Sequence, residues 1–407
     1  MRSIAIIGAG AAGCFAAASL AGSIAITGSS GTVCIYEAGP KPLAKLAVTG
    51  GGRCNLTNTF QNIRSIEEAY PRGFRLMKRA LKEFSPEDTL QWFAKAGVKG
   101  FSPEPDGCVF PSSQDAMEIV NRLLGAIGGA SIHTGKKLLS LSPQGNGWLL
   151  GFADGSSSKA DIVLVTSGGA PNGLPFIDGL DIPWVRCVPS LFTFTINDPG
   201  LRSLMGLVVP VRLSIPGGFR SEGPLLITDW GLSGPAVLKI SSYAARRLHE
   251  SGYKEALAIN WASCSQADAE LEVKGILAAN PQKLLSSAVA FALPQRLWKH
   301  ILQRAGIRED MRCGELGSKG FSRLVATLCS DQYRIEGRSH FREEFVTAGG
   351  VDLQAVNPAT MECRNHPGLY FAGEVLDVDA ITGGFNLQAA WSTAWLAARA
   401  ISKTLDQ

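Results

Sequence analysis

A glycine-rich turn between a short apolar strand and an alanine-rich helix constrains the fold of this chain more than any other feature. Residues 3–7 are apolar and predict a strand, and residues 14–20 have helical character. Between them lie Gly8, Gly10 and Gly13, in the spacing GxGxxG. A second predicted strand, 33–36, ends in Glu37. Strand, glycine turn, helix, strand and acid in this order predict one βαβ unit of a dinucleotide-binding fold.

Each residue of this motif has an expected task. Gly8 makes the tight turn, Gly10 lets the backbone approach a pyrophosphate, and Gly13 lets helix and strand pack closely. The amino end of the helix then offers N–H groups and partial positive charge to the phosphates. Glu37 is expected to accept hydrogen bonds from the ribose hydroxyls of an adenosine without a 2′-phosphate. The alternative is a tight turn beside an exposed glutamate, and the motif alone does not separate FAD from NAD.

Composition excludes several classes of protein. Hydrophobic residues make up 45% of the 407 positions, which excludes a disordered chain. The net charge of +4 is small and dispersed, so we expect no nucleic-acid partner and no anionic membrane. The nine cysteines form no CxxC motif, which favours free thiols and argues against a dithiol reductase. The five histidines lack ligand-like spacing, so no metal site is expected.

The amino-terminal apolar run is interrupted by glycines, so we do not interpret it as a signal peptide. No stretch approaches the ~18 apolar residues of a membrane span. These observations predict a soluble, cytoplasmic protein.

The pattern changes near residue 190 and changes back near 345. Before 190 we expect a helical hairpin, 74–84 and 86–96, with Ser85 capping its second helix. From 190 to 265 the chain reads as strands, apart from a helix expected from 233 to 248, and 266–330 is mostly helical. Glycine motifs then return, followed by an alanine-rich helix over 386–405 for which Asn386 is the expected N-cap.

Longer motifs are more specific than GxGxxG. The run 49–58 reads TGGGRCNLTN, Gly373-Glu374 follows an apolar strand, and Gly383-Gly384-Phe385-Asn386 precedes the last helix. With 8–13, 106–111, 228–235 and 347–351, these runs span nearly the whole chain. The chain resembles the aminoacetone-oxidase-like (BaiN-like) family of FAD-binding flavoproteins, in the glutathione-reductase-like two-domain superfamily.

The resemblance implies an α/β fold with a Rossmann-like FAD-binding domain of glutathione-reductase type. That domain would be discontinuous, 1–189 and 345–407. An inserted β-barrel-like domain would cover 190–265 and 331–344, and a helical subdomain 266–330. Family members carry a basic residue where Cys108 stands and a longer glycine-rich stretch where this chain has 170–175.

The family motifs and the residue chemistry together predict the FAD-binding residues. These are Gly8, Gly10, Ala12, Gly13, Glu37, Ala38, Lys45, Gly51, Gly52, Arg53, Cys54, Asn55, Leu138, Ser167, Gly168, Gly373, Glu374, Asp377, Gly384, Phe385, Asn386 and Leu387. The glycine pair before the last helix is expected to bring its first N–H groups to the N1–C2=O edge of the flavin, where they would favour the reduced anionic form.

The catalytic candidates are Arg53, Cys54 and Asn55. Cys54 could be a reactive thiol, but no partner is adjacent in sequence, so packing in a tight loop is favoured. Arg53 could meet a phosphate or a substrate carboxylate, and a structural salt bridge is an equal alternative. The carboxylates at 377 and 379 could form an acid/base dyad, although a capped bend is favoured. Trp391 and Trp395 are expected on a core face.

We therefore expect an FAD-dependent oxidoreductase that transfers hydride between a small organic substrate, of amine or ketone type, and the flavin. Oxygen or another acceptor would reoxidise the flavin. One alternative is an NAD(P)H-dependent reductase. No second GxGxxG motif between a strand and a helix lies between 150 and 350, so NAD(P)H would dock transiently and not in a domain of its own. Another is a non-enzymatic flavin-binding redox sensor.

Overall fold

The chain forms two compact units. A computed structural model describes residues 2–27, 31–170, 173–339 and 346–405. One unit comprises Met1–Pro189 with Val346–Gln407, and the other comprises Ser190–Phe345.

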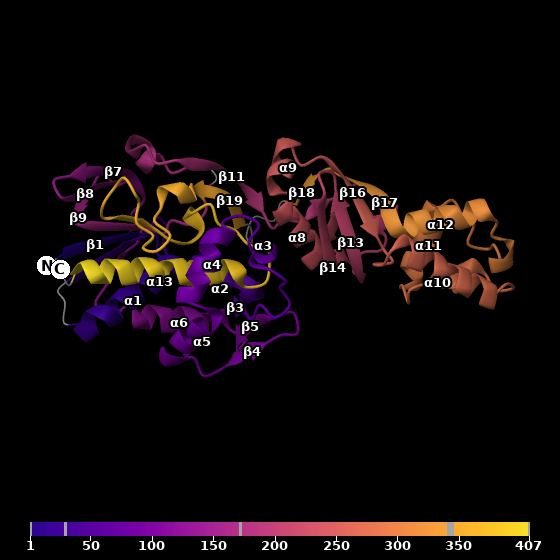
Figure 1. Cartoon of the computed structure of the whole chain (residues 1–407), viewed down its shortest axis with the longest axis horizontal. Helices are drawn as coiled ribbons and strands as arrows, with labels where there is room; N and C mark the ends of the chain where they lie inside the picture. Colours follow the sequence, from indigo (N-terminus) through magenta and orange to yellow (C-terminus); the bar gives the residue numbers. More distant parts are fainter. Residues whose placement is uncertain (1, 28–30, 171–172, 340–345, 406–407) are drawn as a thin grey trace. The chain divides into compact units, whose positions relative to one another are not determined.

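A five-stranded parallel sheet forms the centre of the first unit (Figure 1). The strand order is β20-β10-β1-β2-β6. Residues Ile4, Ile6 and Ile7 of the middle strand are buried, as expected for a parallel sheet covered on both faces. The strands are β1 (Arg2–Ile7), β2 (Gly31–Tyr36), β6 (Ser131–His133), β10 (Ile162–Val165) and β20 (Leu369–Phe371).

Two long helices pack against each other beside this sheet (Figure 1). They are α1 (Ala11–Thr27) and α13 (Phe385–Leu405). Trp391 of α13 is fully buried, 5.3 Å from the ring of Phe15, which confirms that this tryptophan belongs to the core. Trp395 stacks on Phe84 at 5.0 Å.

Shorter elements complete the first unit. Ser85 and Asp88 form a capping box, which confirms the expected start of α5. The other helices are α2 (Ala44–Gly52), α3 (Ile66–Ala69), α4 (Phe74–Glu83), α5 (Pro86–Lys95) and α6 (Ala116–Ala126). Single 3-10 turns lie at Pro175–Leu180, Leu353–Ala355 and Gly373–Val375.

Three small sheets of two or three strands contain the remaining strands of this unit. A sheet of order β3-β5-β4 was not expected from the sequence, because its strands are only two to four residues long. The strands are β3 (Thr57–Asn58), β4 (Phe101–Pro103), β5 (Cys108–Pro111), β7 (Leu138–Gln144), β8 (Gly147–Phe152), β9 (Ser157–Ala160), β11 (Trp184–Ser190) and β19 (Val346–Val351).

A seven-stranded sheet organises the second unit, in the order β17-β16-β13-β14-β15-β12-β18. Alternate side chains of β13 are buried, which is the period of a strand with one covered face. The strands are β12 (Phe194–Thr195), β13 (Val208–Ile215), β14 (Phe219–Ile227), β15 (Gly231–Ser233), β16 (Glu255–Asn260), β17 (Asp331–Ile335) and β18 (Gly337–Arg338).

Several helices pack against that sheet, among them α8 on β13 and β14 and α12 on β16 and β17. The helix expected from 233 to 248 is two helices, α8 and α9, because Ala244 leaves helical geometry between them. The helices are α7 (Pro199–Arg202), α8 (Pro235–Tyr243), α9 (Ala245–Glu250), α10 (Gln266–Ala279), α11 (Gln295–Arg304) and α12 (Ser318–Ser330), with 3-10 turns at Leu285–Ser287 and Cys313–Glu315.

The mixed α/β class with a Rossmann-type domain is thus confirmed. None of the helices in the described ranges is long and apolar enough to cross a bilayer.

Candidate functional site

The glycine turn after β1 leaves no room for side chains at two of its three positions. Gly8 has φ +105°, and a Cβ there would lie 2.6 Å from the carbonyl oxygen of Thr166. A Cβ on Gly13 would lie 2.0 Å from the carbonyl oxygen of Gly8. A Cβ on Gly10 would meet nothing within 4 Å. Gly8 and Gly13 therefore serve packing within the chain, while Gly10 faces open space at the amino end of α1.

Glu37 holds this turn in place. Its Oε2 accepts a hydrogen bond from the backbone N–H of Ala9 at 2.8 Å, and its Oε1 accepts one from Gly39 at 2.7 Å. The sequence motif had indicated ribose hydroxyls as its partners. The carboxylate has lone pairs left after both backbone hydrogen bonds are made. Glu37 can therefore hold the turn and still bind a ribose, as the motif predicts.

Replacement of Glu37 by glutamine should lower both the affinity for FAD and the stability of the apoprotein. An amide keeps one acceptor oxygen, so one of the two backbone N–H groups loses its partner. A hydrogen bond to a charged group contributes about 1.5–3 kcal/mol, which corresponds to a 10- to 150-fold loss in FAD affinity if the ribose uses the carboxylate. FAD titration and urea unfolding of the apoprotein measure the two effects.

Glu87→Gln, which removes the same charge from an exposed position, is the control. An unstable Glu37→Gln apoprotein that binds FAD with unchanged affinity would show that the carboxylate serves the backbone alone.

The glycine run in the 49–58 segment forms a left-handed turn. Gly50, Gly51 and Gly52 have φ values of +59°, +67° and +83°. Side chains at Gly51 and Gly52 would point into open space, whereas Gly50 lies against Asn55 and Phe110. Three successive left-handed residues favour glycine, which explains the run that the sequence showed.

Arg53 and Cys54 are both held by the chain itself. Arg53 Nη1 donates to Glu104 Oε1 at 2.8 Å, and its guanidinium lies 4.1 Å from the centroid of the Phe110 ring. Cys54 is fully buried, and burial raises the pKa of its thiol to about 12. A thiol with that pKa stays protonated at neutral pH and is a poor nucleophile. These contacts favour the salt-bridge alternative for Arg53 and the packing alternative for Cys54.

Asn55 joins this segment to the start of the last helix. With its amide oriented so that both atoms have partners, Nδ2 donates to the carbonyl of Thr57 at 3.1 Å and Oδ1 accepts from the N–H of Gly384 at 3.2 Å. A Cβ on Gly384 would lie 2.3 Å from the Thr57 carbonyl oxygen. Gly384 is thus required for contact with β3. The expected approach to a flavin ring stays a prediction.

The expected N-cap of the last helix is wrong. Helix α13 begins at Phe385, so Asn386 lies in its first turn. The Asn386 amide instead accepts from the N–H of Ala380 at 3.0 Å and donates to the carbonyl of Ala380 at 3.1 Å. Its side chain therefore fastens the preceding loop, a task that spacing alone did not reveal.

Residues from three distant segments meet around Gly373 and Glu374. A Cβ on Gly373 would lie 2.8 Å from the Cβ of Ala12, in the first turn of α1. Glu374 Oε2 pairs with Lys45 Nζ at 3.0 Å, and Glu374 Oε1 accepts from the N–H of Thr347 at 2.9 Å. The structure therefore brings the predicted residues Ala12, Lys45, Gly373 and Glu374 together.

The acid pair at 377 and 379 does not form the dyad considered from the sequence. Asp379 is fully buried and forms a bidentate ion pair with Arg72, through the Nε and Nη2 atoms of the arginine. Asp377 is partly exposed, and its N–H donates to the carbonyl of Val351 at 3.0 Å. Arg72 was missed, because nothing in its local sequence marks a partner 307 residues away.

The other predicted residues lie on neighbouring loops. Ser167 and Gly168 directly follow β10, and the buried Leu138 starts β7 just after Lys136, whose N–H donates to the carbonyl of Glu37 at 2.8 Å. Ala38 is exposed in the loop after β2, and Leu387 is partly exposed in the first turn of α13. Of the shortened stretch 170–175, positions 171–172 lie outside the described residues.

Several buried polar residues behind this site were not predicted. Gln388 Oε1 accepts from the hydroxyls of Thr57 at 2.6 Å and Thr89 at 2.9 Å, and the Tyr70 hydroxyl donates to the Phe385 carbonyl at 2.9 Å. They fix the amino end of α13 against β3 and α5. Polar residues inside a predicted apolar helix face, such as Gln388, are the signal that could have indicated them.

These features fit FAD. Open space at Gly10, Gly51 and Gly52, the amino ends of α1 and α13, and an acid at the end of β2 provide a surface for a dinucleotide. Gly10 would lie against the pyrophosphate, Glu37 beside the ribose, and the 50–55 segment with the start of α13 beside the ring system.

Replacement of Gly10 by alanine tests that placement. The added methyl group meets no protein atom within 4 Å, so we expect the apoprotein to unfold at an unchanged urea concentration. In the complex the methyl group would crowd the pyrophosphate, and overpacking of about 1–3 kcal/mol predicts a ~5- to 150-fold loss of FAD affinity. Gly22→Ala, within helix α1 and also in open space, is the control for FAD binding. Equal FAD affinity in both variants would place the pyrophosphate elsewhere.

Comparisons with known proteins cover nearly the whole chain. A family model described as "HI0933-like protein Rossmann domain" matches residues 2–400. The ribosomal RNA dihydrouridine synthase of Escherichia coli (strain K12) is 31% identical over 97% of this chain and 96% of that protein. The 3-dehydro-bile acid delta(4,6)-reductase of Clostridium scindens is 28% identical over 99% of this chain and 100% of that protein.

A likeness of fold extends further than sequence. The solved structure of 3-ketosteroid delta1-dehydrogenase from Sterolibacterium denitrificans aligns with a TM-score of 0.51 and 12% identity, over 99% of this chain and 100% of that chain. At that identity the match concerns the fold alone.

Proposed function

The chain belongs to the HI0933-like family of FAD-binding Rossmann proteins, and on that basis we propose that it is an FAD-dependent reductase of carbon–carbon double bonds conjugated to a carbonyl group. At the coarser level it is an FAD-binding oxidoreductase. The reaction class and the direction of hydride transfer are the proposed steps.

The names of two full-length relatives support this reaction class. One is named as a dihydrouridine synthase and the other as a delta(4,6)-reductase of a 3-dehydro bile acid. Conversion of uridine to dihydrouridine saturates the C5=C6 bond, which is conjugated to the C4 carbonyl. A Δ4,6 bond system in a 3-oxo steroid is likewise conjugated to its carbonyl. The substrates differ in size and charge, but the bond that is reduced is the same in kind.

When bound and reduced, FAD would supply the hydride that adds to the carbon distant from the carbonyl, and the carbon beside the carbonyl would take a proton from solvent. The residues of the chain would bind FAD and orient it. Glu37 and the turn at Gly10 would hold the adenosine and pyrophosphate, and the Lys45–Glu374 pair joins segments next to them. The amino end of α13 carries partial positive charge, which stabilises negative charge near it.

This proposal modifies the expectation from the sequence. The proposed substrate still contains a carbonyl group, as the sequence predicted. The hydride, however, adds to a carbon conjugated with that carbonyl, and the substrate is reduced instead of oxidised. An external donor must then reduce the flavin, and NAD(P)H is the proposed donor. Oxidation of an amine, or of another small organic substrate by O2, remains the competing prediction.

Anaerobic titration of the FAD-loaded protein tests the proposal. NADPH and NADH are added in turn, and bleaching of the flavin absorbance reports reduction. The reduced protein is then mixed with a 3-oxo-Δ4,6 steroid acid or a uridine-containing RNA, and a separate sample of the oxidised protein is mixed with aminoacetone. Reoxidation by a conjugated substrate, with a gain of two hydrogen atoms by mass spectrometry, supports the reductase. Reduction of the oxidised flavin by aminoacetone, with no turnover of either conjugated substrate, contradicts it.

A further inference from the structure

Helix α4 carries cations along one exposed face. Arg75, Lys78, Arg79 and Lys82 lie at positions i, i+3, i+4 and i+7, so they share one side of the helix, and all are exposed. Among the described residues none of them forms an ion pair. Like charges at these spacings repel each other. The described residues thus hold a row of cations without a direct ion pair, although the charge of Arg79 acts on Glu83 at the end of the same helix.

The row continues onto the last helix. Helix α4 packs against α13, and Arg399 of α13 pairs with Glu83 at the end of α4, with Nη1 and Oε2 2.7 Å apart. The hydrogen bond from Arg399 lowers the pKa of Glu83, and the charges of Arg79 and Lys403 contribute to the shift. Arg79, Arg399 and Lys403 thus gather around one carboxylate.

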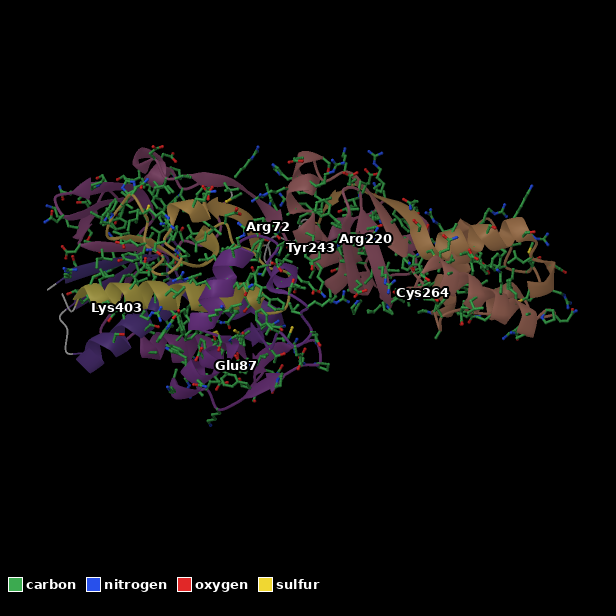
Figure 2. The ribbon with its side chains drawn as sticks, viewed as in Figure 1. Arg72, Glu87, Arg220, Tyr243, Cys264 and Lys403 are labelled. Carbon is green, nitrogen blue, oxygen red and sulfur yellow. The ribbon has the colours of Figure 1, made fainter. Side chains whose placement is uncertain are left out.

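The row begins beside the candidate FAD site. A Cβ on Gly73, the N-cap of α4, would lie 2.5 Å from Val378 Cγ2. Arg72, just before it, pairs with Asp379. Figure 2 shows Arg72 and Lys403 toward opposite ends of the α13 ribbon. A strand lying along the cations would therefore run from the 377–379 segment toward the end of α13.

We propose that Arg75, Lys78, Arg79 and Lys82, with Arg399 and Lys403, form a basic face that binds the phosphate backbone of an RNA substrate. This inference rests on the proposed function, in which uracil is one of the conjugated systems that the enzyme would reduce. Phosphate contacts position a nucleic acid without reading its sequence. The basic face would hold the RNA so that one of its bases reaches the flavin.

The placement of α4 favours RNA over an anionic membrane. Helices that bind membranes insert an exposed apolar side into the lipid. The apolar side of α4, formed by Leu76, Met77 and Ala80, is buried in the protein. The four cations span about 10 Å at 1.5 Å per residue, which is enough to follow successive phosphates. The small net charge of the whole chain predicted no nucleic acid, but it did not show this local gathering.

Binding of a fluorescein-labelled, uridine-containing RNA hairpin to the FAD-loaded protein tests the inference. The variant replaces Arg75, Lys78, Arg79 and Lys82 by glutamine. We expect its affinity to fall about 10- to 100-fold near 0.1 M salt, and the slope of log affinity against log salt to fall by about 2 to 3, at roughly 0.7 per phosphate contact. Reduction of its flavin by NADPH should stay unchanged.

The control variant replaces Lys99, Lys254, Lys283 and Lys319 by glutamine, which removes the same charge from scattered exposed positions. Equal losses in both variants would overturn the inference, because net charge would then explain binding. Loss of binding to phosphatidylserine vesicles in the α4 variant, with no RNA binding by the wild type, would assign the face to a membrane instead.

The test separates this inference from the proposed function. A wild-type protein that reduces the steroid acid but does not bind RNA would refute the basic face and leave the reductase standing. RNA binding through α4 without reduction of any conjugated substrate would refute the reductase and leave the basic face standing.

Discussion

Replacement of Arg72 by methionine is expected to destabilise the apoprotein by about 3–5 kcal/mol, because it leaves the buried Asp379 carboxylate without its guanidinium partner. Asp379 is fully buried, and the Arg72 side chain is 12% exposed. The pair joins the segment before α4 to the loop after β20, so its loss should also loosen the FAD site. Urea unfolding of the apoprotein measures the stability, and FAD titration measures the binding.

Two further variants make this prediction specific. Arg72→Met combined with Asp379→Leu removes both charges and should recover most of the stability, because the unpaired buried carboxylate is gone. Arg399→Met breaks a more exposed pair, with Glu83, and should change stability little. If Arg72→Met behaves like Arg399→Met, the buried pair does not stabilise the fold.

Replacement of Gly384 by alanine should destabilise the apoprotein by about 2–5 kcal/mol. Two effects add: the residue has φ +87°, and its Cβ would lie 2.3 Å from the Thr57 carbonyl oxygen. The left-handed backbone costs about 1–2 kcal/mol for a non-glycine residue, and overpacking about 1–3 kcal/mol. Thermal or urea unfolding of the FAD-free protein gives the sum.

Gly51→Ala is the matched control. Gly51 has φ +67° but open space where its Cβ would point, so this variant has only the backbone effect, near 1 kcal/mol. Similar stabilities for the two variants would mean that the chain shifts easily at Thr57. A stable Gly384→Ala protein with an altered flavin midpoint potential would instead support the expected contact between the start of α13 and the flavin.

Local sequence patterns predicted many of the residues of the candidate FAD site. GxGxxG, the glycine run at 50–52 and the pair at 383–384 are visible because particular backbone angles or close approaches exclude every other residue at most of these positions. Glu37 was found because it ends a strand at a known distance from the turn. The N-cap position was misjudged by two residues, since the start of a helix depends on the loop it meets as well as on its own sequence.

The sequence by itself determined the βαβ unit, the FAD-binding class and the presence of the last helix, because strand and helix periods and left-handed glycines act over a few neighbouring residues. Only the tertiary structure decided which distant groups meet. It paired Arg72 with Asp379, connected Asn55 to Gly384, and gathered Arg399 and Lys403 beside the cations of α4. Ion pairs and hydrogen bonds act over a few ångströms in space, and no local pattern records which residues the fold will bring within that range.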